Sequence, residues 1–444
     1  MKPRPLLGSG ADDFAGERAI PGLFLKEEQL TSTHSTIPSI LSPDFERDPF
    51  SYYQALRDDP VHWDDVMNAY VVSRYEDVRS ILHDSKAFGN KPMEWLNEPI
   101  HGRTILQMDG SEHTKHRRLV NPFFGAVGVE KSREKITFLA ASMIDSVVAL
   151  GRKEIDAGKP RAQIDLVGHF VHDFPVRAIA EVMDLPRDDW AIFGRWYREL
   201  GDAATNFARD EDRLATGIST KLEIEEYISP IVEERMAGHA DDLLSVLCRA
   251  EVDGVPLTIE ELRGWFTLLL QAGGETTSSS IASVIKNLLS NPDQLAAVYE
   301  SPDLIEAAFV ETLRFSPAAH LLPRSVEEDT KIAGKTIPAG SEIVVMLAAA
   351  NRDPAKFRDP EEFIIGREDN SIERAFRGSA DHLAFGDGRH FCVGAWLSRL
   401  EVLIGVGKII ESMRDLQFYG QDPAPEEGIV LRHPVRLDVT YIPA

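Results

Sequence analysis

The segment from Thr258 to Pro292 constrains the fold most strongly. Thr258 and Glu261 have the spacing of a capping box, which starts a helix, and Asn291-Pro292 ends the segment. The helix between them would contain about 30 residues and extend for about 45 to 50 Å. Its middle reads WFTLLLQAGGETTSSSI, which leaves little polar surface on any side. A buried helix of this length requires a large domain around it.

Helical and strand patterns are unevenly distributed over the rest of the chain. Helical periodicity begins near Tyr75 and predominates from about residue 111 to residue 316. Short strands are expected at 60–63 and 69–73, in a hairpin at 332–340, at 341–347 and in the tail at 427–442. The sequence therefore predicts a mainly α fold with small β-sheets at its margins.

The N-terminal residues differ in character from the remainder. Residues 1–40 are polar and irregular, with the cluster TSTHSTIPS at 31–39, and we expect a flexible arm there. No internal repeat or long low-complexity linker follows. We therefore expect a single domain over residues 41–444.

Composition excludes several classes of function. The net charge of −24 repels phosphate backbones, so nucleic acid is not an expected partner. The N-terminus lacks the apolar run of a signal peptide, and no stretch approaches 18 apolar residues, so no membrane span is expected. The two cysteines, Cys248 and Cys392, cannot form a disulfide framework or a multi-cysteine zinc site. These features predict a reduced protein in the cytoplasm.

One of the two cysteines lies in a distinctive loop, which reads FGDGRHFCVGA from Phe385 to Ala395. Gly386 and Gly388 permit left-handed backbone angles, so the loop can fold tightly around the sulfur of Cys392. The helical run that follows would direct free N–H groups at the sulfur and favour the thiolate. Most free cysteines are buried and inert, but the number of specified neighbours favours a functional site.

This loop resembles the haem-binding signature of the cytochrome P-450 family, F-G-x-G-x-H-x-C-x-G, at every fixed position. The resemblance implies the P-450 fold, with haem b between the long central helix and the cysteine loop. It implies that Cys392 is the axial thiolate ligand of the iron, which favours O–O cleavage. Further cofactor contacts are implied for Phe385, Gly386, His390 and Gly394, the last of which would let the backbone approach a flat ligand.

A second motif, AGGETT, lies in the middle of the long helix. The glycines at 273 and 274 each cost about 1 kcal/mol in a helix, and a buried Glu275 costs more unless it is paired or protonated. The motif fits either a close helix crossing or a local opening that admits dioxygen beside an acid and an alcohol. It resembles the acid–alcohol pair of the same family, which implies that Glu275 relays protons and Thr276 donates a hydrogen bond to dioxygen.

A third motif places Glu311 and Arg314 on one helix face. In isolation this is a surface ion pair worth about 0 to 1 kcal/mol. Its position before the cysteine loop, followed by NRDP and by a segment that ends in Arg367, matches the order in the resembled family. The resemblance implies a structural triad of Glu311, Arg314 and Arg367 that holds the haem loop.

A fourth motif, His113 and Arg117, places two hydrogen-bond donors on one helix face. A solvated charged face is the alternative interpretation. The resemblance implies that this pair binds a haem propionate, and that Arg324 and His390 bind there too. Such partners are required when a dianionic cofactor enters an apolar core.

The resemblance covers residues 45–440 and implies a monooxygenase that inserts one oxygen atom from O2 into a small organic substrate. An apolar or natural-product-like substrate is expected. The chain shows no flavin or iron–sulfur module, so electrons are expected from a separate ferredoxin and reductase. A basic cluster is the candidate docking site for an acidic ferredoxin. It consists of Lys115, His116, Arg117, Arg118, Arg389 and Arg399.

The resemblance also indicates where substrate would bind. An apolar wall is expected from Leu321, Leu322, Val430 and Leu431, a cap from Trp95, Met93 and Ile100, and helix contacts from Leu270 and Gly274. Ordinary core packing is the alternative for each of these residues.

Three other functions stay open at this point. A peroxide-driven relative should lack the acid–alcohol pair that Glu275 and Thr276 resemble. A haem-based gas sensor or carrier would need an output domain or partner and would have no use for Glu275. An enzyme of the same fold that catalyses isomerisation or dehydration is compatible with the sequence.

Overall fold

The computed structural model describes residues 37–420 and 425–444. Most of the expected N-terminal arm, residues 1–36, lies outside the described residues. The compact unit begins at Ile37, slightly before the predicted boundary at residue 41. Ile40 is buried, and its backbone N–H donates to the Asp64 carboxylate at 2.9 Å, so residues 37–40 pack on the domain.

Helices form most of the molecule, which confirms the predicted mainly α class. They are α1 (Pro43–Arg47), α2 (Pro49–Asp58), α3 (Tyr75–His83), α4 (Pro92–His101), α5 (Gly110–Phe124), α6 (Ala126–Glu130), α7 (Arg133–Asp156), α8 (Phe174–Val182), α9 (Trp190–Ala204), α10 (Glu211–Ala237), α11 (Leu243–Cys248), α12 (Ile259–Ser290), α13 (Pro292–Glu300), α14 (Leu304–Phe315), α15 (Leu347–Ala350) and α16 (Ala395–Ser412).

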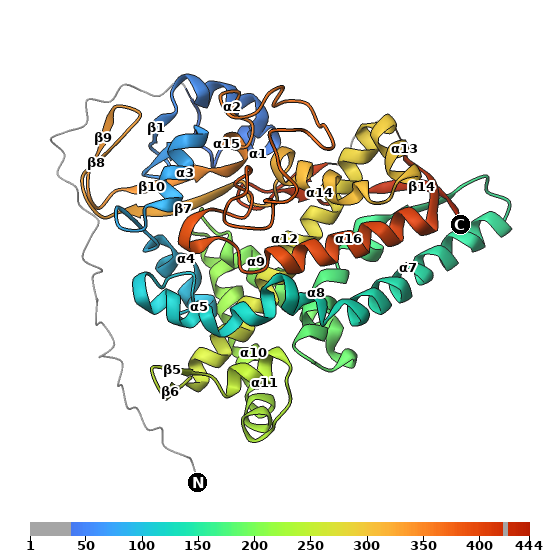
Figure 1. Ribbon diagram of the computed structural model, residues 1–444, viewed down its shortest axis with the longest axis horizontal. Coiled ribbons are helices and arrows are strands. Elements are labelled where there is room, and N and C mark those ends of the chain that lie inside the picture. Colours follow the sequence, from blue (N-terminus) through green and yellow to red (C-terminus); the bar gives the residue numbers. More distant parts are fainter. Residues whose placement is uncertain (1–36, 421–424) are drawn as a thin grey trace, which may run out of the picture. The chain divides into compact units, whose positions relative to one another are not determined.

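The long helix predicted from the capping box is α12, at the centre of Figure 1. Both capping hydrogen bonds form, because the N–H of Glu261 donates to the Thr258 hydroxyl and the N–H of Thr258 to the Glu261 carboxylate. The helix packs against α8, α9, α10, α14 and α16. It is α-helical throughout, so the expected local opening beside Gly273 and Gly274 is not present.

The strands form small sheets. They are β1 (Val61–Asp64), β2 (Ala69–Val72), β3 (Phe88–Gly89), β4 (Ala162–Asp165), β5 (Glu251–Val252), β6 (Val255–Pro256), β7 (Leu321–Val326), β8 (Thr330–Ile332), β9 (Lys335–Ile337), β10 (Glu342–Met346), β11 (Met413–Phe418), β12 (Glu426–Glu427), β13 (His433–Pro434) and β14 (Asp438–Pro443). The predicted strands near residue 60, near residue 70 and at 341–347 are confirmed as β1, β2 and β10. The predicted hairpin is confirmed as β8 and β9.

The largest sheet has the order β1-β2-β10-β7-β3 and lies at the upper left of Figure 1. Strand β10 is parallel to β2 and antiparallel to β7, with Val345 opposite Leu322. This pairing fixes the direction in which the residues of β7 point. The predicted tail strand is interrupted, because residues 428–432 turn between β12 and β13, beginning at Gly428 with φ of 102°.

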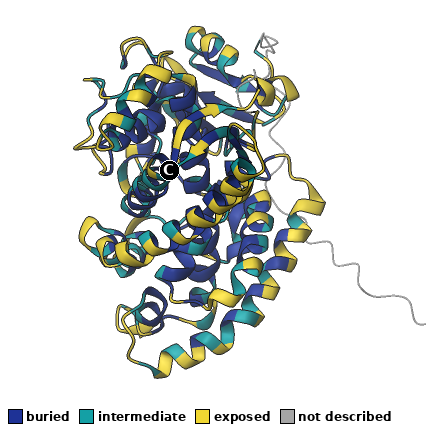
Figure 2. Cartoon of the chain, turned by 90° about the vertical axis from the view of Figure 1, so that its right-hand side faces the viewer, coloured by how far each residue is buried: buried dark blue, intermediate teal, exposed yellow. Residues whose placement is uncertain are grey.

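The interior is apolar and continuous around α12, with two smaller clusters beside the large sheet. Figure 2 shows buried residues concentrated inside and exposed residues on the outer faces of the helices. No helix in the described ranges is long and apolar enough to cross a membrane.

Candidate functional site

The cysteine loop has the geometry that its glycines permit. Gly386 and Gly388 have φ of 70° and 68°, in the left-handed region that favours glycine. A side chain at Gly388 would also meet the carbonyl oxygen of Leu82, because an added Cβ would lie 2.6 Å from it. The N–H of Cys392 donates to the carbonyl of Phe385 at 2.8 Å and closes the loop. Helix α16 begins three residues after the cysteine.

The sulfur of Cys392 lies at the start of this helix. The backbone N–H groups of Gly394 and Ala395 donate hydrogen bonds to Sγ. Burial raises the pKa of the thiol above its ordinary value, and the two N–H groups and the charge of Arg117 lower it only in part. A bound metal cation is the kind of group that would make this sulfur a thiolate.

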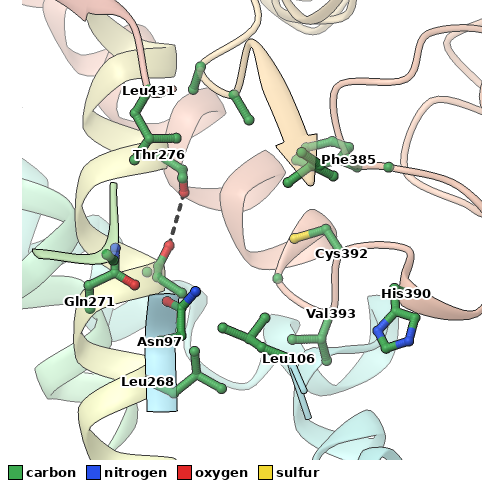
Figure 3. A pocket seen from close by; sticks show the side chains of 18 of the residues that line it. Asn97, Leu106, Leu268, Gln271, Thr276, Phe385, His390, Cys392, Val393 and Leu431 are labelled. Carbon is green, nitrogen blue, oxygen red and sulfur yellow. Dashed lines mark hydrogen bonds between the residues drawn. The ribbon is translucent and has the colours of Figure 1, made fainter. Parts of the chain in front are cut away.

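A cavity of about 360 Å³ separates the cysteine loop from α12. Figure 3 shows Cys392, Phe385 and His390 on one side of it and Thr276, Gln271 and Leu268 on the other. Every residue expected to contact the cofactor lines this cavity. These residues are His113, Arg117, Arg324, Phe385, Gly386, His390, Cys392 and Gly394. The fold therefore brings together residues that are far apart in the sequence, such as His113 and Gly394.

A buried guanidinium faces the cavity from β7. Arg324 is 5% exposed, and it donates to the carbonyl of Pro323 at 2.8 Å. It forms no ion pair with any residue that the structure describes. Burial lowers its pKa to about 10, and Asp109 raises it in part. A cation buried in this way is costly unless an anion binds beside it.

Two histidines lie near this guanidinium. The rings of His113 and His390 are 4.2 Å apart between centroids. His390 Nε2 is 3.0 Å from the Asp109 carboxylate, whereas neither ring nitrogen of the buried His113 has a hydrogen-bond partner within the described residues. Burial lowers the pKa of His113 to about 3, with further lowering by His390 and Arg117. An unpaired buried imidazole of this kind needs a partner that the described chain does not supply.

Comparison with known proteins decides the family. The cytochrome P450 family model matches residues 219–440. Pulcherriminic acid synthase of Bacillus subtilis (strain 168) is 32% identical over 405 residues, which cover 91% of this chain and 97% of that protein. Cytochrome P450 monooxygenase PikC of Streptomyces venezuelae is 32% identical over 416 residues, with coverages of 91% and 92%. The structure of CYP109E1 from Bacillus megaterium in complex with testosterone matches with a TM-score of 0.78 and 28% identity, covering 90% of this chain and 99% of that one.

The chain belongs to the cytochrome P450 family. The predicted family, fold and enzyme class, a monooxygenase among the oxidoreductases, are confirmed. The family implies a haem iron cofactor, and the residues around the cavity fit one. They include the sulfur of Cys392, a donor that suits iron, and the cation of Arg324, which has no carboxylate partner among the described residues. They also supply an open position at Gly394, where an added Cβ would meet only the Cys392 sulfur, at 3.8 Å.

In the predicted triad of this P450, Glu311 contacts both arginines. The Glu311 carboxylate is 2.7 Å from Nη2 of Arg314 and 3.0 Å from Nε of Arg367. All three side chains are at most 5% exposed. Arg314 also donates to the carbonyls of Asn351, Pro360 and Glu362, in the segment that leads to the cysteine loop. This network fixes the path of that segment.

The acid and the alcohol on α12 face different surroundings. Thr276 lines the cavity, and its hydroxyl donates to the carbonyl of Ala272 at 2.9 Å. Glu275 does not line the cavity and faces α9 instead, where an added Cβ at Gly201 would lie 2.3 Å from its Oε2. Burial raises the pKa of Glu275 to about 7, with a smaller contribution from Asp202. The carboxylate therefore exchanges protons near neutral pH.

The expected substrate contacts are only partly on the cavity. Leu321, Leu322 and Val430 line it, as do Met93 and Leu431. Ile100, which was expected in the cap, does not line it, and neither do three other expected contacts. The three are Trp95, Leu270 and Gly274.

Each of these three residues faces another part of the protein. The Trp95 ring contacts Phe207 at 6.0 Å between centroids and lies beneath the guanidinium of Arg209. Leu270 is fully buried in the main core. Gly274 faces Tyr197, because an added Cβ would lie 2.9 Å from that ring. The predicted residues therefore belong to helices that do line the cavity, α4 and α12, but they lie on other faces of those helices.

The predicted basic cluster is largely neutralised. Lys115 pairs with Asp253, Arg399 pairs with Glu306 through two hydrogen bonds of 2.7 Å, and His116 is buried beside Glu261. Arg117 points inward and donates to the carbonyl of Phe391 at 2.6 Å. Of the six residues, Arg118 and Arg389 are exposed.

Several polar residues on the cavity were missed by the sequence reasoning, among them three residues of different helices. Asn97 comes from α4, Gln271 from α12 and Glu401 from α16. Burial raises the pKa of Glu401 well above its ordinary value, and Thr277 lowers it in part. Gln271 and Glu401 each stand alone in an apolar helical run, LLLQAGG and SRLEVLIGV, and that isolation was a usable signal.

Proposed function

We propose that this P450 binds haem b through Cys392 and inserts one oxygen atom from O2 into a small, apolar, natural-product-like substrate. The observation that carries the proposal is the cavity itself, which places the Cys392 sulfur across from Thr276 on α12. The names of the relatives, pulcherriminic acid synthase and PikC, and the testosterone complex of CYP109E1 support an organic substrate of this kind.

The residues around the cavity would hold the cofactor by charge and by shape. Arg324, Arg117, His113 and His390 supply the donors for two propionates, and the first of these is a cation that lacks a carboxylate in the described structure. Phe385, Gly386 and Gly394 leave room for a flat group beside Cys392. Charge-assisted hydrogen bonds of this type are about twice as strong as neutral ones.

When bound, the haem iron supplies the redox chemistry that activates dioxygen. The chain's own residues manage protons and water. Thr276 presents a hydroxyl to the cavity, and Glu275, with a pKa of about 7, holds a proton on the α9 side of the same helix turn. Apolar side chains such as Leu268 and Leu322 exclude water around them.

Electrons would come from a ferredoxin and its reductase in the cytoplasm. The exposed cation Arg389 lies on the cysteine loop, three residues before Cys392, and donates to the carbonyl of Gly110 at the start of α5, the helix that carries the exposed cation Arg118. The two cations would steer an acidic partner to this face. Arg118→Glu should slow reduction by ferredoxin and weaken its salt dependence. Arg213→Glu, a charge reversal at an exposed position on α10, is the control and should leave both unchanged.

Replacement of the alcohol tests the proposed reaction. Thr276→Ala should consume NAD(P)H through ferredoxin but form about 10-fold less product, since general acid–base groups contribute at least that much. Ser280→Ala is the control, because Ser280 lines the cavity one turn away and its hydroxyl donates to the Thr276 carbonyl. Both variants are assayed with a substrate that a ligand screen has identified by its effect on the spin state of the haem iron. Full coupling in Thr276→Ala, or equal turnover with peroxide alone, would contradict the proposal.

A further inference from the structure

Two primary amides lie on the cavity wall across from Cys392. Asn97 belongs to α4 and Gln271 to α12, and these two helices pack against each other. Both side chains are buried, at 5% and 7% exposure. Figure 3 shows both on the α12 side of the pocket, away from Cys392 and His390. Amides in an otherwise apolar wall need hydrogen-bond partners.

The protein itself supplies few partners for them. Asn97 Nδ2 is 3.2 Å from the sulfur of Met93, which is a weak acceptor. The amide of Gln271 forms no hydrogen bond with any described residue. An amide left unsatisfied in a dry site costs about 1 to 3 kcal/mol. A ligand that satisfies both amides would recover this free energy.

The hydroxyl groups of the same wall are already engaged. Thr205 donates to the carbonyl of Gly201 at 2.9 Å, Thr276 to that of Ala272 and Ser280 to that of Thr276. These are bonds to the preceding turn of each helix, and they leave the hydroxyls little capacity to donate to a ligand. Thr277, which also lines the cavity, interacts with Glu401. Among the amide and hydroxyl side chains of this wall, Asn97 and Gln271 therefore stay available.

No charged residue of α4 or α12 lines the cavity, and the carboxyl group in the lining, Glu401, belongs to α16. The cationic and imidazole groups of the cavity are Arg117, Arg324, His113 and His390, which the proposed function assigns to the haem propionates. Around the amides the lining is apolar, with residues such as Leu106 and Leu268. A carboxylate or ammonium group placed there would lose its hydration without gaining an opposite charge.

We propose that Asn97 and Gln271 select a neutral substrate that carries an N–H beside a C=O, a secondary amide or lactam, on an otherwise apolar body. This inference rests on the proposed monooxygenase function. Each primary amide offers one donor group and one acceptor, so an N–H and a C=O on one edge of the ligand match them. That edge would be held on the α4 and α12 side, which leaves the apolar body toward Cys392.

Binding to the haem-loaded full chain tests the inference. The probes are lactams of increasing ring size, ending at laurolactam, the cyclic ketones of matched ring size, and dodecanoate. Affinity is measured by calorimetry and by the spin-state shift. The best lactam should bind about 10-fold more tightly than its matched ketone, which lacks the N–H, and dodecanoate should bind more weakly than both.

Variants assign the preference to the two residues. Gln271→Leu and Asn97→Leu should each weaken lactam binding by about 10-fold and leave ketone binding within about 3-fold. Leu268→Met, a volume-conserving change three residues from Gln271, should affect lactam and ketone alike. The melting temperature of each variant shows that it is folded.

The outcomes separate the two proposals. Three results would overturn the amide inference and leave the monooxygenase proposal intact, each in a protein with a normal thiolate spectrum. They are the absence of a lactam preference, the absence of binding by any probe, and an unchanged lactam preference in both leucine variants. An absent thiolate spectrum overturns the monooxygenase proposal, while calorimetry still reports whether lactams are preferred.

Discussion

Glu275 and Thr276 are adjacent on α12, yet only Thr276 lines the cavity with Cys392. The Glu275 carboxylate lies against Gly201 of α9, which has no side chain at the point of contact. Successive residues of a helix are turned by about a quarter of a circle or more, so one turn of α12 can connect two different environments. The pair therefore joins the cavity to the α9 side of the molecule, where Asp202 contributes to the raised pKa of Glu275.

Gly201→Ala should displace the Glu275 carboxylate, since an added Cβ would lie 2.3 Å from Oε2. That oxygen ends a flexible side chain, so the free energy of unfolding should change by less than about 1 kcal/mol. Product formed per NAD(P)H consumed should fall. Gly194→Ala on the same helix is the control, because its nearest neighbour is Arg198 at 3.8 Å. It should be stabilising by about 0.5 to 1 kcal/mol and leave coupling unchanged. Equal coupling in the two variants would count against this role of Gly201.

Glu275→Gln should change stability in a pH-dependent way. The folded state holds the Glu275 proton more tightly than the unfolded state, because burial raises the pKa from 4.5 to about 7. The contribution of this proton to the free energy of unfolding is therefore fully present below about pH 4.5, and it is lost as the pH rises through 7. Glutamine avoids this loss, and its advantage over glutamate should grow by about 2 to 3 kcal/mol between pH 5 and pH 9. Thermal unfolding of both proteins at pH 5 and pH 9 measures this change. A stability difference between them that does not vary with pH would contradict the raised pKa of Glu275.

Glu311→Gln should destabilise the fold strongly. It removes the charge that neutralises Arg314 and Arg367, both buried, and breaking such an ion pair costs about 3 to 5 kcal/mol. The haem content of the purified protein should fall with it. Glu306→Gln, on the same helix α14, removes one partner of the more exposed pair with Arg399 and should cost at most about 1 kcal/mol. Similar melting temperatures for the two variants would show that the buried triad stabilises the fold no more than the exposed ion pair does.

Arg324→Gln should weaken the retention of haem. The guanidinium is buried and has no carboxylate partner among the described residues, so a propionate would supply one. Loss of a charged hydrogen bond worth about 1.5 to 3 kcal/mol corresponds to about 10- to 100-fold faster transfer of haem to apomyoglobin. Arg213→Gln, at an exposed position on α10, should transfer haem at the unaltered rate. An unaltered rate in Arg324→Gln as well would argue against the propionate contact.

Features set by neighbours in the sequence were predicted well. The capping box at Thr258 and Glu261 defines the start of α12 locally, and the strand, hairpin and helix signals on either side are equally local. The order of the motifs then indicated the family, which the comparisons confirm.

Features set by rotation about a helix axis were predicted poorly. Leu268 and Gln271 line the cavity while Leu270, between them, packs in the core, and the apolar sequence of α12 gives no contrast by which to choose the face. Pairing over long distances was also missed. Asp253 and Glu306 neutralise Lys115 and Arg399 from more than 90 positions away, and no local pattern records this.

The central claim is that the sulfur of Cys392 is the thiolate ligand of haem iron. The absorption spectrum of the reduced, carbon monoxide-bound protein tests it most directly, because the position of the Soret band reports which protein atom binds the iron. The wild type should show the red-shifted band of a thiolate ligand, and Cys392→Ser should lose it while Cys248→Ser keeps it. An unchanged Soret band in Cys392→Ser would contradict the account.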